Sequence, residues 1–290
     1  MNPVSATTVG LLHPGSMGAA VAAQLRRAGA RVVWDPTGRG PATVRRAREA
    51  GLTAAEGMAD LVARSDVVIA LCPPAAAEDV AREVAGHRPA GKIYVEANAV
   101  SSRCLRRIAE ALPETVVVDA AVVGSPPVGG KTPRLYASGP VEAVDLLDRL
   151  FTATDVRLCR LGETIGAASA LKLAYTSYQK SSRVLAALAY GVAEANGVAS
   201  ELLDLAGRRS GSYLAEPDYI PRTAARAWRW APELEEAADL VADSGLPDDL
   251  MRAVATVLSH WEDARDADLS IEEALARLRD GKSGTVSPPR

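Results

Sequence analysis

The feature that most constrains the fold is an alternation of short β-branched runs and helical patterns in the first half of the chain. Seven runs of strand length follow one another between Thr7 and Leu161: TTVGLL, RVVW, DVVIAL, KIYVEA, TVVVDA, RLYAS and VRLCR. Such runs are typical of buried parallel strands. Helices are expected between most of them, over residues 18–28, 43–50, 75–85, 101–112 and 141–150. The pattern predicts α/β structure, with βαβ units in a Rossmann-type doubly wound parallel sheet.

The strand pattern stops after Gly162, which predicts an all-α second part. Residues 163–196 form one Ala/Leu-rich stretch that ends at an Asn-Gly pair, as a helix C-terminus does. Further helical patterns follow, and each is divided from the next by a proline that can sit in the first turn or before it: Pro217, Pro221, Pro232 and Pro247. We predict a dinucleotide-binding domain over residues 1–161 and a helical substrate and dimerisation domain over 162–282, joined by the long interdomain helix. Residues 283–290 are expected to be a disordered tail.

Charge and cysteine content narrow the class of partner. The 36 acidic and 33 basic residues give a formal charge of −3, which provides no global attraction to nucleic acid or to an anionic membrane. Cys72, Cys104 and Cys159 lie far apart without a C-x-x-C pair, which predicts neither a disulfide framework nor a metal site. The chain shows no export pattern and no apolar stretch of about 18 residues. We expect a cytoplasmic protein with a small-molecule substrate and no nucleic-acid or membrane partner.

A glycine-containing turn follows the first predicted strand. The segment His13-Pro14-Gly15-Ser16-Met17-Gly18 opens a helix. A dinucleotide fingerprint G-x-G-x-x-G needs one glycine for the turn, one for approach of the backbone to pyrophosphate and one for helix–strand packing. Gly15 and Gly18 match the second and third, whereas His13 stands where the first is expected. A plain βα turn is the alternative, but the strand before it and the helix after it favour a cofactor site.

The loop after the second predicted strand bears on the choice of cofactor. An acid at the end of this strand favours NAD because it binds ribose hydroxyls, whereas an arginine nearby accommodates the 2′-phosphate of NADP. Both types occur, as Asp35 and Arg39. Thr37, Arg39 and Thr43 form a candidate phosphate-accepting loop, so NADP(H) is favoured and NAD(H) is possible.

Four motifs occur in the order found in a known family. The run G-x-x-H-P-G-S-M-G resembles the G-x-I-G-x-G-x-M-G opening of the β-hydroxyacid dehydrogenases, the group of 3-hydroxyisobutyrate dehydrogenase and the dinucleotide domain of 6-phosphogluconate dehydrogenase. Cys72-Pro73-Pro74 resembles the family's loop near the nicotinamide, and the segment from Val118 to Val122 resembles its D-A-P-V-S-G-G substrate loop. The segment LGETIGAASALK, ending at Lys172, resembles the one that carries the catalytic lysine. The resemblance spans nearly the whole chain, and a subgroup with H-P-G-x-M-G, C-P-P and A-S-A-L-K signatures is most similar.

The chain departs from the family pattern at three places. Val123 replaces the serine of the substrate loop, Tyr175-Thr176 replaces the asparagine pair that follows the lysine, and the family's D-x-S-T loop reads Glu96-Ala97-Asn98-Ala99. A small hydroxyacid substrate therefore does not simply carry over. The resemblance implies cofactor contacts from the first turn, the Thr37 and Arg39 loop, Cys72, Pro73, Pro74 and Asn98, and substrate contacts from Val122, Val123, Gly124, Tyr175, Thr176 and Gln179.

One polar stripe interrupts the predicted long helix. Ser169, Lys172, Tyr175 or Thr176, and Gln179 recur at spacings of three and four residues, which places them on one face. A solvated face is one interpretation, but the rest of the helix is so apolar that a lysine there needs a cavity or a partner. With the resemblance added, we predict that Lys172 is the catalytic proton donor and base. Tyr175, Tyr178 and Asn98 are secondary candidates.

The leading function is an NAD(P)-dependent oxidoreductase of the β-hydroxyacid dehydrogenase type, with hydride transfer in an interdomain cleft. The alternative is an imine reductase, which Val123 and Tyr175 favour and Lys172 opposes. A cofactor-binding sensor without turnover is a third interpretation, because the first glycine is missing. We also expect a homodimer formed through the apolar long helix. The resemblance points to Glu233 as an interdomain candidate.

Overall fold

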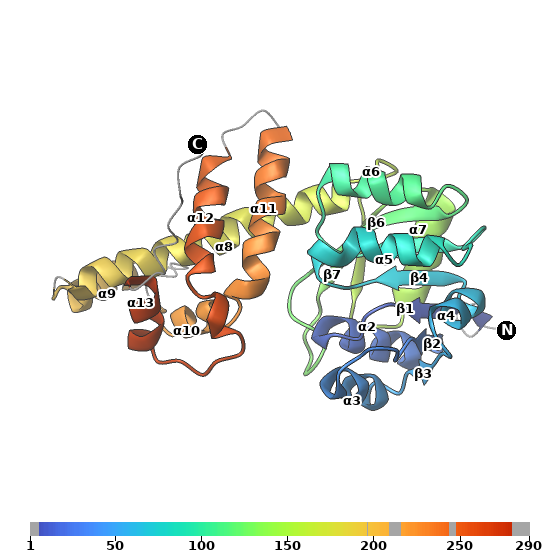
Figure 1. The fold of residues 1–290 in the computed structure, drawn as a ribbon, viewed down its shortest axis with the longest axis horizontal. Coiled ribbons are helices and arrows are strands. Elements are labelled where there is room, and N and C mark those ends of the chain that lie inside the picture. Colours follow the sequence, from blue (N-terminus) through green and yellow to red (C-terminus); the bar gives the residue numbers. More distant parts are fainter. Residues whose placement is uncertain (1–5, 196, 209–215, 244–247, 280–290) are drawn as a thin grey trace, which may run out of the picture. The chain divides into compact units, whose positions relative to one another are not determined.

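The computed structural model describes residues 6–195, 197–208, 216–243 and 248–279. The chain divides into two compact units, of which the first ends at Leu173 and the second begins at Ala174 (Figure 1). Helix α8 (Ala167–Ala195) begins in the first unit and continues in the second. Its start lies four residues after the predicted one.

The first unit contains an eight-stranded sheet in the order β3-β2-β1-β4-β5-β6-β7-β8. Neighbouring strands are parallel except β6 and β7, which run antiparallel. The chain starts in the middle of the sheet and extends to both sides, which confirms the doubly wound Rossmann arrangement. The strands are β1 (Thr8–Leu11), β2 (Arg31–Trp34), β3 (Thr53–Ala54), β4 (Val67–Ala70), β5 (Ile93–Glu96), β6 (Val116–Val123), β7 (Arg134–Ser138) and β8 (Arg157–Arg160).

Two details of the sheet differ from the expectation of seven parallel strands. Strand β3 has only two residues, both exposed, so it leaves no apolar run to detect. Strand β7 is antiparallel because residues 124–133 contain no helix, and a parallel connection needs a crossover of a dozen or more residues.

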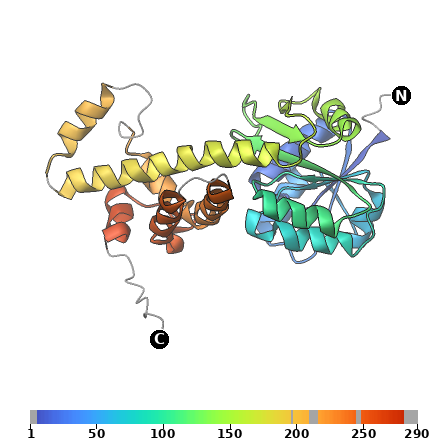
Figure 2. The same ribbon diagram turned by 90° about the horizontal axis from the view of Figure 1, so that it is seen from above.

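Helices cover both faces of the sheet (Figure 2). Apolar side chains of α2 and α7 pack on one face, whereas those of α4, α5 and α6 pack on the other. Strand β4 contributes to both clusters, because alternate residues of a strand point to opposite faces. The helices are α2 (Ser16–Arg27), α3 (Pro41–Glu49), α4 (Met58–Arg64), η1 (Pro74–Ala76), α5 (Ala77–Ala85), α6 (Ser102–Ala111) and α7 (Val141–Phe151). The five predicted helices lie within about two residues of these bounds, and α4 was missed.

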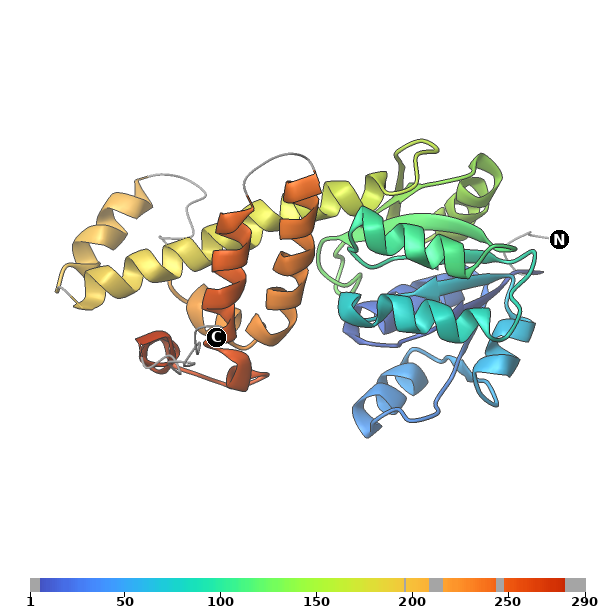
Figure 3. The ribbon, with the colours of Figure 1, turned by 45° about the horizontal axis from the view of Figure 1, so that its top comes forward.

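The second unit is helical, as expected. Helices α11 and α12 lie side by side within it (Figure 3). Trp230 and Trp261 are buried, and the Trp261 indole N–H donates to the Ala274 carbonyl at 2.7 Å. Besides α8, the helices are α9 (Ala199–Gly207), α10 (Tyr219–Ala224), α11 (Ala227–Asp243), α12 (Asp249–Ser259), η3 (Glu262–Ala264) and α13 (Ile271–Arg279).

The expectations about the prolines and the tail have different outcomes. Pro221 lies in the first turn of α10, but Pro232 lies inside α11, beyond the first turn, so the expected placement of that proline is wrong. Burial of the α11 face that carries Trp230 and Leu234 holds the helix together despite the missing N–H. Pro247 and the tail over residues 283–290 lie outside the described residues. Across the described ranges, no helix is long and apolar enough to cross a membrane.

Candidate cofactor and catalytic site

Four of the predicted site segments follow the carboxyl ends of neighbouring parallel strands. His13 comes after β1, Thr37 after β2, Cys72 after β4 and Asn98 after β5. These strands are adjacent in the sheet and run in the same direction, so their carboxyl ends share one edge. In doubly wound sheets, ligands bind at this edge, next to the point where the strand order reverses. Strand β1 stands at that point.

The β1–α2 turn has the close packing of a dinucleotide-binding turn. A Cβ atom at Gly18 would lie 2.5 Å from the His13 carbonyl oxygen, which leaves room only for glycine. This is the packing that the third fingerprint glycine permits. Gly15 is the N-cap residue of α2, and no side chain of the described residues caps this helix. Its first-turn N–H groups therefore form the kind of end that binds an anion.

Two arginines from the segment after β2 hold this turn. Arg39 donates from Nη2 to the Leu12 carbonyl at 3.2 Å, and its Nη1 lies 3.3 Å from His13 Nδ1. Arg46 donates from Nε to the Pro14 carbonyl at 3.2 Å. Burial, followed by the positive charges of Arg39 and then Arg46, lowers the pKa of His13 below its usual value. The ring is therefore neutral at pH 7.

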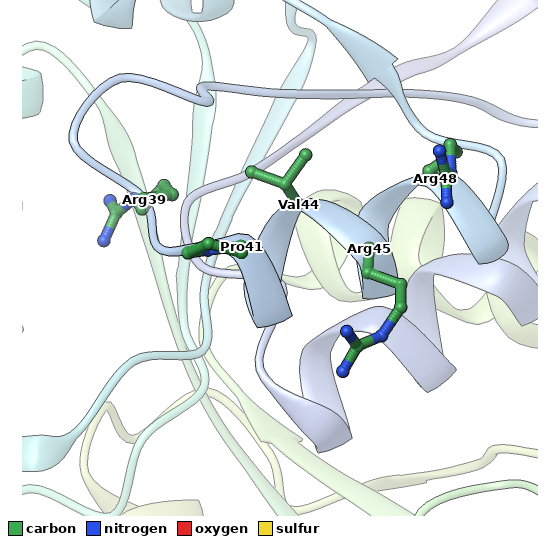
Figure 4. Close-up of a pocket in the computed structure, with 5 residues that line it drawn as sticks. All are labelled: Arg39, Pro41, Val44, Arg45 and Arg48. Carbon is green, nitrogen blue, oxygen red and sulfur yellow. The ribbon is translucent and has the colours of Figure 1, made fainter.

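A basic pocket lies beside these contacts, on the surface of α3. It has a volume of about 290 Å³ and is lined by Arg39, Pro41, Val44, Arg45 and Arg48. Figure 4 shows Arg39 in the loop before α3, with the other four residues on the helix itself. Three of the five lining side chains are guanidinium groups, so the pocket suits an anionic group.

The acid at the end of β2 points inward. Asp35 is buried, and its Oδ1 accepts a hydrogen bond from the Thr37 backbone N–H at 2.9 Å. Thr37 itself is exposed. Thr43 Oγ1 accepts a hydrogen bond from Arg46 Nη2 at 3.0 Å, so this threonine supports an arginine. Around the β2 end, the accessible charge is therefore positive.

A second cluster lies at the ends of β4 and β5. Asn98 Nδ2 donates to Glu96 Oε1 at 2.5 Å and to Cys72 Sγ at 3.3 Å, and the Asn98 backbone N–H donates to the same Glu96 oxygen. Burial raises the pKa of Glu96 to about 8, and it raises the pKa of Cys72 to about 12. At pH 7 the acid is largely protonated and Cys72 is a thiol, which is a poor nucleophile. Asn98 is the polar group that joins these two strand ends.

Asp119 on β6 fixes the start of helix α8. It is fully buried, and its Oδ2 accepts hydrogen bonds from the backbone N–H groups of Ala168 and Ser169, at 2.9 and 3.0 Å. The Ser169 hydroxyl donates to Asp119 Oδ1 at 2.5 Å, and Ser138 also bonds this carboxylate. A carboxylate from a distant strand therefore caps a helix N-terminus, which the helix dipole favours.

The predicted polar stripe on α8 divides by burial. Ser169 and Thr176 are buried, Lys172 is half-buried, and Tyr175 is 47% exposed. Gln179 Nε2 donates to the Tyr175 hydroxyl at 3.2 Å. Lys172 belongs to the first unit, one helical turn beyond Ser169, whereas the later members of the stripe belong to the second.

The predicted substrate loop ends strand β6. Val122 is buried in the core of the first unit, and half-buried Val123 places an apolar group where the family has a serine. Gly124 has φ of +122°, and a Cβ atom there would lie 3.2 Å from Pro133.

Among the loop residues after β4, Pro73 is exposed and Pro74 opens the short helix η1.

A buried ionic cluster in the second unit was missed. Lys180 on α8 and Glu233 on α11 are both buried and form a direct ion pair, and Lys180 Nζ lies 5.3 Å from the centroid of the Trp230 ring. Lys180 comes four residues after Thr176, which comes seven after Ser169, so all three lie on one face of the helix. This spacing is the signal in the sequence that could have identified Lys180. The resemblance points to Glu233 but not to its partner Lys180.

Comparison with known proteins supports the sequence-based family. A sequence profile described as the NAD binding domain of 6-phosphogluconate dehydrogenase matches residues 8–162, and one described as a domain of unknown function, DUF1932, matches residues 193–261. A relative from Methanothermus fervidus, the "Uncharacterized 28.5 kDa protein in 7S RNA 5'region", is 29% identical over 174 residues. That alignment covers 60% of this chain and 66% of the relative.

Several solved structures share the fold. The conserved protein MTH1747 of unknown function, described as structurally similar to 3-hydroxyacid dehydrogenases, is 27% identical with a TM-score of 0.65, over 91% of this chain and 100% of that one. Mycobacterium tuberculosis 3-hydroxyisobutyrate dehydrogenase is 21% identical with a TM-score of 0.73, over 94% and 99% of the two chains. An imine reductase from Pseudomonas sp. is 18% identical with a TM-score of 0.57, over 94% and 99%.

Proposed function

Because the chain belongs to the family of the NAD-binding domain of 6-phosphogluconate dehydrogenase, we propose that it is an oxidoreductase that transfers a hydride between NADP(H) and a carbonyl or alcohol carbon, as β-hydroxyacid dehydrogenases do. The observation that carries the proposal is the β1–α2 turn. Its Gly18 leaves no room for a Cβ atom, and two arginines fix its carbonyl groups. These residues fit the pyrophosphate of a dinucleotide at the start of α2.

NADP(H) is the proposed cofactor rather than NAD(H). Asp35, the acid that could bind ribose hydroxyls, is buried and engaged by the Thr37 backbone N–H. The accessible groups around it are the guanidinium groups of Arg39, Arg45 and Arg48, which bind a phosphate by charge-assisted hydrogen bonds. A bound 2′-phosphate would therefore find cations and no competing carboxylate.

Titration of both reduced cofactors by fluorescence tests this preference. We expect NADPH to bind at least tenfold more tightly than NADH, and Arg39→Ala to remove most of that difference. Arg82→Ala serves as the matched control because this exposed arginine lies on α5 and pairs with Glu78 and Asp79. Equal affinities in the unaltered protein, or an Arg39→Ala variant that weakens both cofactors alike, would contradict the proposed preference.

Lys172 is the proposed proton donor and acceptor. The nicotinamide supplies or accepts the hydride when it is bound, and the protein must then manage the proton on the substrate oxygen. Lys172 lies one turn after Ser169, whose backbone and hydroxyl are both held by Asp119. This anchoring gives the lysine backbone a fixed position, as general acid–base catalysis requires. Asn98 and Tyr175 are the proposed substrate-orienting groups.

An imine is the alternative substrate class. Half-buried Val123 presents an apolar side chain at the end of β6, which disfavours a substrate carboxylate. Turnover of three substrate panels, namely hydroxyacids, ketones and cyclic imines, with both cofactors would separate the two classes. Activity on hydroxyacids or ketones supports the first proposal, and activity confined to imines supports the alternative.

We further propose that the protein is a homodimer formed through its helical unit. Apolar side chains remain exposed on this unit, with Leu205 at 60%, Leu250 at 51% and Val198 at 46%. A second copy would bury such groups. Sedimentation of the full chain at micromolar concentration should give the mass of a dimer, and a monomer would contradict the proposal.

A further inference from the structure

The residue that replaces the first fingerprint glycine has a defined chemical state. An arginine can only donate hydrogen bonds, so the contact between Arg39 Nη1 and His13 Nδ1 makes Nδ1 the acceptor. A neutral imidazole with an accepting Nδ1 carries its proton on Nε2. The lowered pKa of His13 is consistent with this neutral ring. His13 therefore offers one N–H donor, at Nε2.

That donor lies at the glycine where pyrophosphate approaches the backbone. A Cβ atom built on Gly15 would be 3.4 Å from His13 Cδ2 and 3.6 Å from His13 Nε2, so this edge of the ring lies beside Gly15. Gly15 is the second fingerprint position, the one that allows close approach to the phosphates. Within the described residues, Nε2 forms no hydrogen bond. The donor is thus available to a ligand.

Resting on the proposed NADP(H) function, we propose that His13 is a cofactor-binding and specificity-determining residue with two separable roles. Its Nε2–H donates to a phosphate oxygen of the dinucleotide pyrophosphate, while its Nδ1 holds the Arg39 guanidinium in place for the 2′-phosphate. One side chain thereby links recognition of the two phosphate groups. The histidine takes over a phosphate contact at the position where the common fingerprint has only backbone.

The two roles can be separated with amides that imitate one ring nitrogen each. In His13→Asn, the amide oxygen is as many bonds from the backbone as Nδ1, so it can still accept from Arg39, but nothing replaces Nε2. In His13→Gln, the amide N–H is as many bonds away as Nε2, so the phosphate donor is kept and the Arg39 acceptor is lost. His13→Ala removes both groups.

Calorimetric or fluorescence titration with NADPH and NADH measures the result without any substrate. His13→Asn should weaken both cofactors by a similar factor of about ten and keep the NADPH preference. His13→Gln should weaken NADPH by about tenfold and leave NADH nearly unchanged, so that the preference falls. His13→Ala should show both losses. Circular dichroism and thermal melting confirm that each variant is folded, and Arg82→Ala is the control for loss of a cation elsewhere.

The outcomes distinguish this inference from the proposed function. If the unaltered protein binds neither cofactor, the proposed function fails. If it binds NADPH but all three His13 variants keep wild-type affinities, the inference fails and the proposed function stands. Equal losses for NADPH and NADH in both amide variants would also overturn the inference, because the two roles would not be separable.

Discussion

Two polar regions lie along the sheet of the first unit and differ in how their charges are satisfied. At the β1 and β2 ends, Arg39 and Arg46 bond neutral acceptors, namely backbone carbonyls, a threonine hydroxyl and the His13 ring. At the end of β5 and in the middle of β6, Glu96 and Asp119 are buried and bonded to nearby amide and hydroxyl groups. The first region therefore keeps its net positive charge, whereas the acids of the second region are buried and satisfied by hydrogen bonds within the protein.

This difference indicates separate tasks. A cation that bonds neutral groups is held in place without being neutralised, so it can still attract an anionic ligand. A buried acid that is either protonated or surrounded by hydrogen-bond donors does not attract a cation. Its role is to hold the strands and helices around it in place. We interpret the arginine region as the cofactor side and the acidic region as the support for Asn98 and the start of α8.

The largest effect is expected at Lys172, on the helix whose start is fixed by Asp119 of the acidic region. Lys172→Met should lower kcat by about 10²-fold or more, because a general acid is lost, while NADPH affinity stays nearly unchanged. Lys131→Met is the matched control, since it makes the same change at an exposed lysine elsewhere in the first unit. Steady-state kinetics and cofactor titration check both statements. If the lysine variant keeps near-wild-type turnover while Tyr175→Phe or Tyr178→Phe abolishes activity, a tyrosine is the proton donor. That result would favour the imine-reductase alternative.

An intermediate effect is expected from breaking the packing of the cofactor side. Gly18→Ala places a methyl group 2.5 Å from the His13 carbonyl oxygen, so the turn must shift and the free energy of unfolding should fall by about 2 kcal/mol. Cofactor affinity should fall as well. Gly207→Ala is the control, since a Cβ atom there meets nothing within 4 Å. Chemical denaturation that gives equal stabilities for the two variants would contradict the close packing of the turn.

The smallest effect concerns the closed acidic region and appears as a pH dependence. Because the folded-state pKa of Glu96 is raised from 4.5 to about 8, the stability that its protonation contributes is fully present below pH 4.5 and is lost as the pH rises through 8. Glu96→Gln should reduce the fall in unfolding free energy between pH 7 and 8.5 by roughly 1 kcal/mol. The exposed Glu110→Gln is the control. Denaturation curves at both pH values measure the slope, and an unchanged slope in Glu96→Gln would show that this carboxyl is not the group responsible.

The sequence predicted the parts of the molecule that depend on local pattern. Alternation of strands and helices predicted the doubly wound sheet, and a motif predicted the glycine at the tightly packed position 18. The catalytic role of Lys172 stays a prediction. The inward turn of Asp35 and the contact of Arg39 with His13 were not predicted, because they depend on side-chain directions in a loop. Nor did any pattern connect Asp119 with Ser169, which lie 50 residues apart in the chain. Such contacts arise only once the sheet has brought distant segments together.

The anchoring of α8 by Asp119 has a consequence for where the first unit can be cut. The boundary predicted at residue 161 follows the last strand, but three of the donors to this buried carboxylate, the N–H groups of Ala168 and Ser169 and the Ser169 hydroxyl, come later in the chain. A fragment that ends with β8 would leave a buried charge without most of its partners. The first turns of α8 are therefore as much a part of the nucleotide-binding module as its strands, and any exchange of helical domains between related chains must take place beyond them.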